Sequence, residues 1–474
     1  MSIDQILDTK ITKLTLFLSI PFTIIVAFVL VKVAPIYALV AALGLGVLIV
    51  TFTNTDFALY ILIFSMLLSP EFGSRTTMGG GITIRIDDII LAIICFTWLA
   101  KTALNKQLTL FKETPLNKPI KLYLFVCIIS TAFGMMMRRV QVLNGAFFII
   151  KYVEYFMIYF MVVNQIQSKK QMDNYVISLL ITFVIVSIVA IAQIPTGKRV
   201  TAPFEGDAGE PNTLGGYLIL IIAINLNLIL TPGILSKPKY RRWLLIITGF
   251  AVFPYLLTNS RGSWAAGIPV VIGYVLWSKR RWVIIGYAAA LISIAPFILP
   301  DVVIDRVKYT FTPQKGYARS LQEEVGGITL DTSASERVRS WRSAFKDIKK
   351  HPLLGFGITG WRFLDAQYMR VLIETGVVGL FFFVYMLVQI LKNTQKIYMN
   401  SQIPFLKTFA QGFYIATISM MTHSLGANTF IIIRIMEPFW FICGLVISIP
   451  NIEKIELEKL RLMEEKFTSV KIGT

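Results

Sequence analysis

Residues 174–194 read NYVISLLITFVIVSIVAIAQI and contain no charged side chain. At a rise of about 1.5 Å per residue, an α-helix of this length spans about 30 Å, which is the thickness of the hydrocarbon core of a bilayer. Basic residues flank the run, with Lys169 and Lys170 on one side and Lys198 and Arg199 on the other. We therefore interpret this run as a transmembrane helix.

Apolar runs of this kind recur along the whole chain. Of the 474 residues, 55% are hydrophobic and only 15% are charged, which is too apolar for a soluble domain of this size. The fold class is therefore predicted to be all-α, a polytopic integral membrane protein with about fourteen transmembrane helices. The predicted helices lie near residues 14–32, 36–52, 56–69, 87–103, 120–137, 144–164, 174–194, 212–231, 242–257, 263–278, 281–299, 369–391, 406–423 and 428–449. No small-residue cleavage pattern follows the first run, so we interpret it as a permanent helix.

The short connections between these runs differ in charge, and this difference predicts the orientation. One alternating set of connections is rich in lysine and arginine, with Lys101, Lys106, Lys112, Lys118, Lys121, Lys169, Lys170, Lys237, Lys239, Arg241, Arg242, Lys279, Arg280 and Arg281. By the positive-inside rule this set is cytoplasmic, together with both termini. We therefore predict a multi-pass protein of an inner (cytoplasmic) membrane. The formal net charge of +19 also suits contact with anionic membrane lipids, so nucleic acid is not needed to explain it.

One outer connection is much longer than the others and divides the chain. We predict helices 1–11 in residues 1–299, an extracytoplasmic loop in 300–368, helices 12–14 in 369–449, and a cytoplasmic tail in 450–474. The loop contains a predicted amphipathic helix of about four turns that ends at His351-Pro352. Its signals are a capping box and an apolar stripe at helical spacing, formed by Ser333, Glu336, Val338, Trp341, Phe345 and Ile348. We expect the apolar stripe to rest on the membrane domain.

The predicted outer side carries many arginines, which suggests an anionic ligand. The basic residues on this side are ten arginines and one lysine, namely Arg75, Arg85, Arg138, Arg139, Lys198, Arg199, Arg261, Arg337, Arg339, Arg342 and Arg362. The chain has three cysteines, all within apolar runs, and two histidines. Neither set has the spacing of metal ligands, so we predict no metal and no other cofactor.

A first candidate cluster is the polar break Thr258-Asn259-Ser260-Arg261-Gly262-Ser263 between two apolar runs. The Arg261 guanidinium keeps its charge and offers five donors that match phosphate oxygens in pairs. The alternative interpretation is an arginine at the membrane boundary that contacts lipid headgroups.

A second cluster follows the seventh predicted helix and contains Gly197-Lys198-Arg199, Pro203-Phe204-Glu205-Gly206 and Pro211-Asn212-Thr213. Basic side chains beside a helix N-terminus form an anion site, because the helix dipole and free backbone N–H groups add to the side chains. The alternative is a polar surface loop with an ordinary helix cap.

A third cluster extends from Glu336-Arg337-Val338-Arg339-Ser340-Trp341 through Pro352-Leu353-Leu354-Gly355-Phe356-Gly357 to Asp365 and Glu374-Thr375-Gly376. Asp365 lies just outside a predicted span beside Arg362, where a carboxylate can take a proton from a sugar hydroxyl. The alternative for Asp365 is a helix N-cap. The deeper pairs Lys151 with Glu154 and Arg434 with Glu437 are interpreted as structural. His423 is expected to be hydrogen-bonded rather than catalytic.

These three clusters, in this order on a helical membrane scaffold, resemble the bacterial O-antigen polymerase and ligase family. The resemblance covers about residues 195–445. It depends on Arg199…Gly206…Pro211-Asn212, the Ser260-Arg261-Gly262 turn, and Arg337 four residues before Trp341, followed by Pro352-Leu353-Leu354-Gly355-Phe356-Gly357.

The resemblance implies a donor glycan on undecaprenyl diphosphate and an inverting, metal-independent transfer at the outer face of the membrane. Arg261 and Arg337 would neutralise the diphosphate, and Asp365 would be the base. Ligase members carry a histidine ten residues before a glycine, whereas this chain has Asp365 at about that distance from Gly376. This arrangement resembles that of membrane glycosyltransferases that polymerise peptidoglycan. The remaining predicted substrate-binding residues are Arg199, Arg339, Arg342, Arg362 and Asn212.

Two glycan-transfer functions, and a transporter from a different class, are compatible with these patterns. The first is a polymerase of lipid-linked repeat units, for which a chain-length regulator and a flippase are the expected partners. The second is a ligase that transfers the glycan to a lipid or protein acceptor. The third is a polysaccharide or lipid transporter, which explains the many helices but not the long outer loop. A scaffold of the envelope machinery is a further, remoter alternative.

Overall fold

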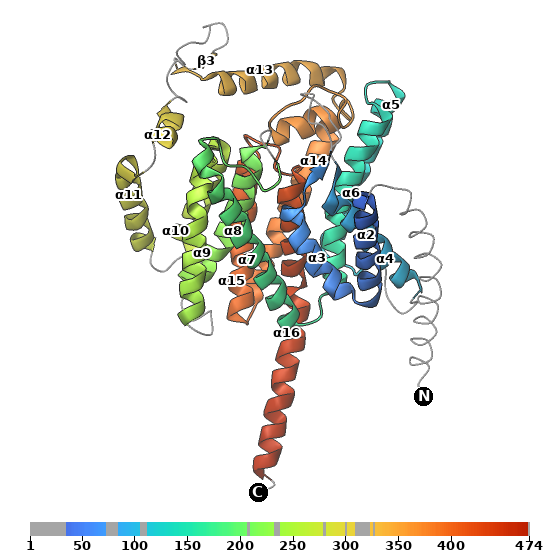
Figure 1. Cartoon of the computed structure of the whole chain (residues 1–474), viewed down its shortest axis with the longest axis vertical. Helices are drawn as coiled ribbons and strands as arrows, with labels where there is room; N and C mark the ends of the chain where they lie inside the picture. The colour runs from blue at the N-terminus through green and yellow to red at the C-terminus, as the bar shows by residue number, and fades with distance from the viewer. Residues whose placement is uncertain are drawn as a thin grey trace.

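The fold is described by a computed structural model of the chain (Figure 1). The predicted first span at 14–32, Arg75 and Gly206 lie outside the residues that the structure describes. These residues are 35–72, 84–104, 111–205, 209–231, 238–277, 281–298, 301–308, 323–325 and 328–472.

Each predicted span that falls within the described residues overlaps a helix, although the span predicted at 428–449 begins as a helix only at Ile433. The first half of the chain forms α2 (Pro35–Thr53), α3 (Thr55–Leu68), α4 (Ile86–Leu104), α5 (Asn117–Met136), α6 (Val142–Gln165), α7 (Lys169–Ala192) and α8 (Pro211–Leu230). The second half forms α9 (Pro238–Leu257), α10 (Arg261–Trp277), α11 (Arg281–Ile298), α12 (Asp301–Lys308), α13 (Thr332–Asp347), α14 (Gln367–Asn400), α15 (Pro404–His423) and α16 (Ile433–Ile472). The all-α prediction is confirmed for the described residues, apart from two short antiparallel strand pairs. These pairs join β1 (Glu71–Phe72) to β2 (Ile84–Arg85) and β3 (Glu324–Val325) to β4 (Ile328–Thr329).

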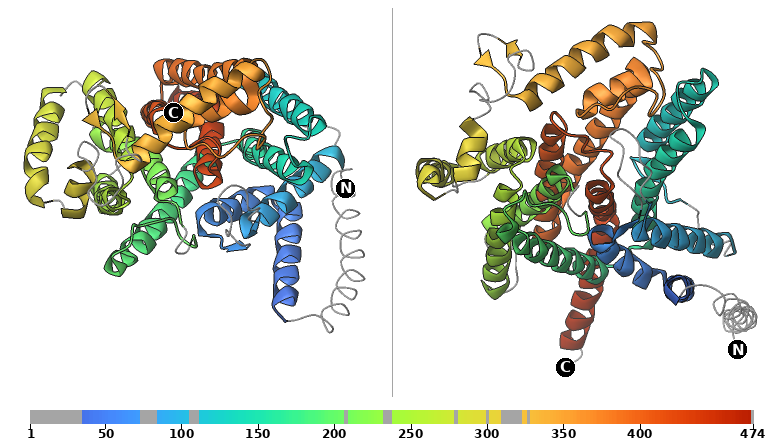
Figure 2. Two further views of the ribbon diagram at one scale, coloured as in Figure 1. Left: turned by 90° about the horizontal axis from the view of Figure 1, so that it is seen from above. Right: turned by 45° about the horizontal axis from the view of Figure 1, so that its top comes forward.

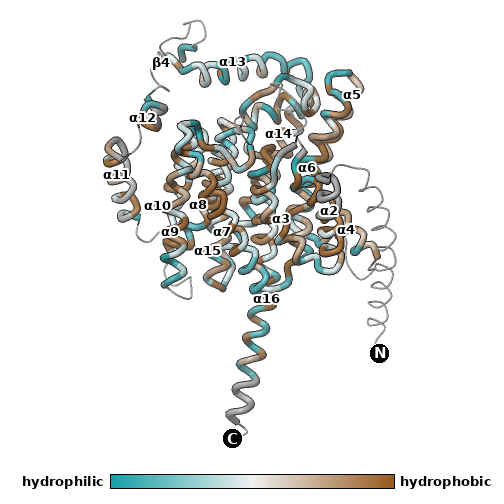
Figure 3. The backbone as a smooth tube through the Cα atoms, viewed as in Figure 1, coloured by the Kyte–Doolittle hydropathy of each residue, from teal (hydrophilic) through white to brown (hydrophobic). Residues whose placement is uncertain are grey.

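Six helices of the described chain are long and apolar enough to cross a membrane. Their candidate spans are Asn117–Met136, Val142–Gln165, Lys169–Thr196, Pro211–Leu230, Gln367–Asn400 and Ile433–Glu465. The tube in Figure 3 shows brown apolar stretches along the bundle and teal polar stretches on α13 and on the part of α16 that projects from the bundle. The protein is therefore a helical membrane protein, and the total of about fourteen spans stays a prediction.

Two helices form the centre of the bundle. The apolar windows of α8 and α16 are each 89% buried, because α8 packs on α9, α10 and α15 while α16 contacts α3, α6, α14 and α15. Seen from above, α2–α4 and α9–α11 lie on different sides of this centre (Figure 2). The helix α16 also continues through most of residues 450–474, so the predicted tail is largely a helical extension of the last span.

The predicted amphipathic helix is present as α13, which lies across one end of the bundle (Figure 1). Two details differ from the sequence-based expectation. The N-cap is Asp331, whose Oδ1 atom accepts the Ala334 N–H at 2.9 Å, rather than Ser333. The buried α13 residues are Ser335 and Ala344, whereas Phe345 of the predicted apolar stripe is 54% exposed. We call this end of the molecule, with α13 and the adjoining ends of α8, α10 and α14, the α13 end.

Glycines shape the segment between α13 and α14. The helix α14 is broken at Gly376, where φ is +70° and ψ is −172°, and the Pro352–Gly357 segment packs into this break. A Cβ atom on Gly376 would lie 2.1 Å from the Leu353 carbonyl oxygen, and one on Gly134 of α5 would lie 2.5 Å from the Phe356 carbonyl oxygen. Only glycine permits this backbone conformation and this approach at little cost. The loop thereby fixes the start of α14 and the segment before it, where Asp365 lies.

Candidate functional site

The turn that carries Arg261 is a helix start. Ser260 precedes α10, and its Oγ atom accepts the Ser263 N–H at 3.2 Å, which is an N-cap bond. Asn259 has a φ of +50°, a left-handed conformation that asparagine tolerates better than most residues. Its Oδ1 atom is buried and has no hydrogen-bond partner. Arg261 is the first residue of α10, and its guanidinium lies at the surface of the α13 end.

The two clusters that were predicted separately around Arg199 and Arg261 are brought together. Arg199 donates from Nε to the Thr258 carbonyl oxygen at 3.1 Å and from Nη2 to the Asn259 carbonyl oxygen at 2.9 Å. Asn212, at the start of α8, accepts a hydrogen bond from Ser260 Oγ at 2.5 Å. Both predicted substrate-binding residues therefore support the turn that presents Arg261.

Arg261 is paired with the N-cap of α13. Its Nη2 atom lies 2.8 Å from Asp331 Oδ2, and the side chains are 20% and 4% exposed. Asp331 thus caps α13 with one carboxylate oxygen and binds Arg261 with the other. The sequence analysis missed this residue, although its position directly before Thr332-Ser333 is a typical N-cap signal.

Arg337 and Asp365 form the second ion pair of this site. The Arg337 Nη2 atom donates to Asp365 Oδ2 at 3.2 Å, and both side chains are about one-third exposed. Burial raises the pKa of the Asp365 carboxyl, and the Arg337 guanidinium counteracts part of this rise. The Asp365 Oδ1, Arg337 Nε and Trp341 Nε1 atoms are buried and have no hydrogen-bond partner.

The other predicted arginines have different partners. Arg339 Nε lies 3.2 Å from Glu323 Oε1, and Arg342 Nη1 lies 2.7 Å from Glu323 Oε2. Arg362 lies over the Trp361 ring, with 4.7 Å between the guanidinium carbon and the ring centroid. Asp365 therefore pairs with Arg337 from α13 rather than with its neighbour Arg362, and Glu323 is a second carboxylate that the sequence analysis missed.

A further ion pair lies inside α14, just below the site. Arg370 Nε donates to Glu374 Oε1 at 3.1 Å, and the same oxygen accepts the Thr359 N–H at 3.1 Å. Glu374 thereby connects the loop after α13 to the first turns of α14. Its i,i+4 spacing from Arg370 is a signal that sequence reading could have used.

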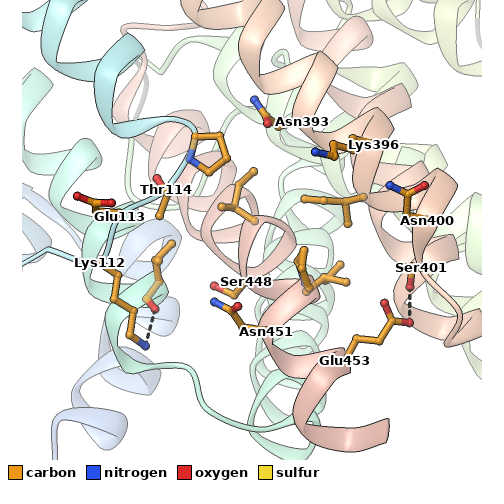
Figure 4. A pocket seen from close by; sticks show the side chains of 16 residues that line it. Lys112, Glu113, Thr114, Asn393, Lys396, Asn400, Ser401, Ser448, Asn451 and Glu453 are labelled. Atoms are coloured by element: carbon orange, nitrogen blue, oxygen red, sulfur yellow. Dashed lines mark hydrogen bonds between the residues drawn. The ribbon is translucent and has the colours of Figure 1, made fainter.

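A separate hollow lies at the opposite end of α14 from Asp365. Figure 4 shows the side chains that line it. It has a volume of about 400 Å³ and is lined by residues of the segment before α5, the end of α14 and the middle of α16, including Lys112, Lys396, Asn400, Asn451 and Glu453. None of the predicted site residues lines it. Within the described residues, no group of three or more histidine, cysteine, aspartate or glutamate side chains could hold a metal ion.

Comparison with known proteins supports one family. Residues 243–384 match the O-antigen ligase family model, which covers α9 to the middle of α14 and includes Arg261, Arg337 and Asp365. No curated protein matches the chain. The match confirms the resemblance to the O-antigen polymerase and ligase family for this part of the chain, and it points to glycan transfer in polysaccharide biosynthesis.

Proposed function

We propose that this protein joins lipid-linked oligosaccharide repeat units into a surface polysaccharide. The donor would be a growing glycan on undecaprenyl diphosphate, and the acceptor would be the end of another lipid-linked repeat unit. The match to the O-antigen ligase family supports glycan transfer as the chemistry. The observation that carries the proposal is the Arg337–Asp365 pair with its unpartnered buried atoms.

Those unpartnered atoms are suited to a polar ligand. Arg337 and Trp341 are four residues apart on α13 and therefore share one face of that helix. Each presents a buried N–H without an acceptor, and Asp365 presents a buried oxygen without a donor. A buried polar atom without a partner costs about 1–3 kcal/mol. A glycan diphosphate supplies phosphate oxygens for the two N–H groups and a sugar hydroxyl for the carboxylate oxygen.

The leaving group requires charge compensation, which arginine supplies. Arg337 lies six residues after Asp331, the partner of Arg261, so the two arginine contacts are separated by roughly 9 Å along the α13 axis. Guanidinium groups held in this way stabilise a departing diphosphate without a metal ion. Arg261 and Arg337 are accordingly assigned to the diphosphate, and Arg199 and Asn212 support the turn that holds Arg261.

Asp365 is assigned as the base. The acceptor hydroxyl oxygen attacks the anomeric carbon of the donor while its proton passes to the Asp365 carboxylate. The bond between the anomeric carbon and the diphosphate oxygen breaks, and the electron pair leaves with undecaprenyl diphosphate. A single displacement of this kind inverts the anomeric configuration. The raised pKa of Asp365 makes it a stronger base than an ordinary aspartate.

The first experiment is a reconstituted reaction of the purified protein with a lipid-diphosphate-linked repeat unit. We expect a ladder of glycan lengths by gel and mass spectrometry, unchanged by EDTA and strongly reduced in Asp365→Asn. A ladder that requires Mg²⁺ after chelation would contradict the arginine mechanism. Thiol labelling of single cysteines placed at 325 and 240 tests the orientation, because only the former should react from outside the cell.

The match to the O-antigen ligase family favours one second candidate, transfer by a ligase to a lipid or protein acceptor. The two functions share the donor and the arginine site and differ in the acceptor. Without a second acceptor, a ligase leaves the donor unextended, whereas a polymerase elongates it. Addition of a lipid or protein acceptor to an inactive reaction therefore distinguishes them.

A further inference from the structure

A line of buried polar side chains runs beneath the turn that carries Arg261. It begins at Thr429 in the loop after α15 and passes through His423 at the end of α15 to Ser263 in α10. The Thr429 Oγ1 and His423 Nδ1 atoms are 2.7 Å apart, and His423 Nε2 lies 3.1 Å from Ser263 Oγ. All three side chains are 0% exposed.

The line continues toward the surface through the N-cap of α10. Ser263 Oγ donates to Ser260 Oγ over 2.8 Å, and Ser260 Oγ donates to Asn212 Oδ1 over 2.5 Å. Asn212 then donates from Nδ2 to Glu210 Oε1 at 3.1 Å. Arg261 lies between Ser260 and Ser263 in the sequence. The hydrogen bonds of this line therefore fix the residues on both sides of Arg261.

The donor and acceptor of each hydrogen bond in this line follow from the number of hydroxyl protons. The one hydroxyl proton of Ser260 is used on Asn212, so the proton of Ser263 must go to Ser260. Ser263 can then only accept from His423, which therefore carries its proton on Nε2 and accepts the Thr429 hydroxyl proton on Nδ1. Full burial disfavours a charged imidazole, so His423 is assigned as neutral and is an Nε2–H donor of defined tautomer.

Two glycines of α8 make room for the line. A Cβ atom on Gly215 would lie 2.2 Å from Ser263 Oγ, and one on Gly216 would lie 3.1 Å from His423 Cε1. Larger residues would push α10 and α15 away from α8. On its other side, the turn is fixed by the two bonds from Arg199 to the Thr258 and Asn259 carbonyl oxygens. The turn is therefore held from both sides.

We propose that His423 is a positioning residue for Arg261, acting through Ser263 and Ser260. This inference rests on the proposed role of Arg261 at the diphosphate. The histidine never touches substrate, because it is fully buried. Its Nε2–H fixes the Ser263 and Ser260 hydroxyls, which fix the first turn of α10 and the direction of the Arg261 side chain.

Two neutral amides at position 423 separate positioning from packing. In His423→Gln, the longer side chain places an N–H where the imidazole has Nε2 and keeps the bond to Ser263. In His423→Asn, the shorter side chain reaches only the Thr429 side. We expect the Gln variant to retain most of the activity. The Asn variant should lose about tenfold or more in kcat with a change in KM below about twofold, since a misplacement of about 1 Å can cost up to 100-fold.

A double-mutant cycle with Arg261→Lys tests whether the effect passes through Arg261. The lysine keeps the positive charge but lacks the planar guanidinium. In the Arg261→Lys background we expect His423→Asn to lower kcat by less than about twofold, because the guanidinium that His423 positions is already absent. An equal loss in both backgrounds, or equal activities of the Gln and Asn variants, would overturn the inference.

Hydrogen exchange of the purified protein gives a second measurement that is independent of catalysis. We expect the Ser263 amide to exchange about tenfold faster in His423→Asn than in the wild type, and at the wild-type rate in His423→Gln. If the wild type forms no ladder, the proposed function fails, and this exchange pattern still decides whether His423 orders the turn. Unchanged exchange in the Asn variant would refute the ordering role.

Discussion

Two sets of ion pairs in this protein differ in their surroundings. At the α13 end, Arg261 and Arg337 pair with Asp331 and Asp365, and the arginine side chains are 20% and 30% exposed. Deeper in the bundle, Lys151 of α6 pairs with Asp88 of α4 at 2.5 Å and with Glu154 at 3.0 Å, and its side chain is only 5% exposed.

The buried set is larger than one pair and connects several helices. Arg85 lies 2.5 Å from Asp87 Oδ2 and 3.7 Å from Glu437 Oε2, and Arg434 of α16 donates to the Leu67 and Pro203 carbonyl oxygens. These bonds join the ends of α3, α4 and α16. Such charges are tolerated within a membrane protein because they neutralise one another.

This difference in exposure indicates which charged side chains can take part in a reaction. An ion pair sealed among helices cannot exchange its partner without exposing an uncompensated charge, so its role is to hold the helices together. A pair at a partly exposed end can release its carboxylate when a diphosphate arrives. Removing a charged side chain should therefore reduce the amount of folded protein in the buried set and should reduce catalysis at the α13 end.

The largest expected effect on stability is at Lys151. Replacement by Met keeps the length of the side chain but leaves the Asp88 and Glu154 carboxylates buried without their cation. Breaking a buried pair in this way costs about 3–5 kcal/mol. We expect Lys151→Met to lower the midpoint of thermal unfolding in detergent and the yield of membrane-inserted protein.

The matched control is Lys169→Met. Lys169 also pairs with an aspartate, Asp173, at 2.6 Å, but the side chains are 28% and 35% exposed. An exposed pair contributes about 0.2–1 kcal/mol. Equal effects of the two substitutions would show that burial does not distinguish these pairs, and the comparison would fail.

At the α13 end, Arg261→Ala and Arg337→Ala should reduce the activity far more than the stability, because Asp331 keeps its hydrogen bond from the Ala334 N–H and Asp365 is partly exposed. Loss of one group that stabilises developing charge costs about 10²–10³ in kcat. We expect normal amounts of each variant in the membrane and a loss of glycan elongation of this order, measured by gel. Full-length chains from either variant would exclude that arginine from the diphosphate site.

The pH dependence separates Asp365 from a neighbouring aspartate. Burial raises the pKa of the Asp365 carboxyl, so its basic form is lost at a higher pH than that of an ordinary aspartate. Hydrogen bonds from Lys350 and Trp361 lower the pKa of Asp347 instead. We expect kcat/KM to fall as the pH decreases through the raised pKa of Asp365.

Two variants test which group causes this fall in kcat/KM at low pH, which is the acid limb of the pH profile. Asp365→Asn should remove the limb and lower kcat/KM by about 10² or more, which is the usual contribution of a general base. Asp347→Asn should leave the profile unchanged. An acid limb that persists in the residual activity of Asp365→Asn would assign the base to another group.

Much of the fold could be predicted from the sequence, because a membrane imposes long apolar runs of defined length. The helix at 332–347 was also predictable from its periodicity. The break at Gly376 was not, since its left-handed backbone depends on the Pro352–Gly357 segment that packs against it. The first span at 14–32 is not tested by the described residues.

The candidate site could be predicted only as residue types. Clusters of arginine at turns indicated an anion site, but their partners Asp331 and Glu323 were missed because pairing depends on how α13 lies across the bundle. Asn212 was predicted to bind substrate, and in the structure its Oδ1 atom accepts a hydrogen bond from Ser260 Oγ. His423 was correctly expected to be hydrogen-bonded, since a buried imidazole requires partners.

The smallest effects are expected at Arg339 and Arg342, which share Glu323 as a partner. Their side chains are 39% and 63% exposed, so each pair contributes about 0.2–1 kcal/mol to stability. If the arginines act only on Glu323, then Arg342→Ala and Glu323→Gln should have the same small effect on elongation, below about fivefold. If Arg342 also binds glycan, Arg342→Ala should raise KM while Glu323→Gln, which frees the arginine, lowers it. Opposite shifts in KM would therefore extend the substrate site along α13, and equal shifts would place Arg342 outside it.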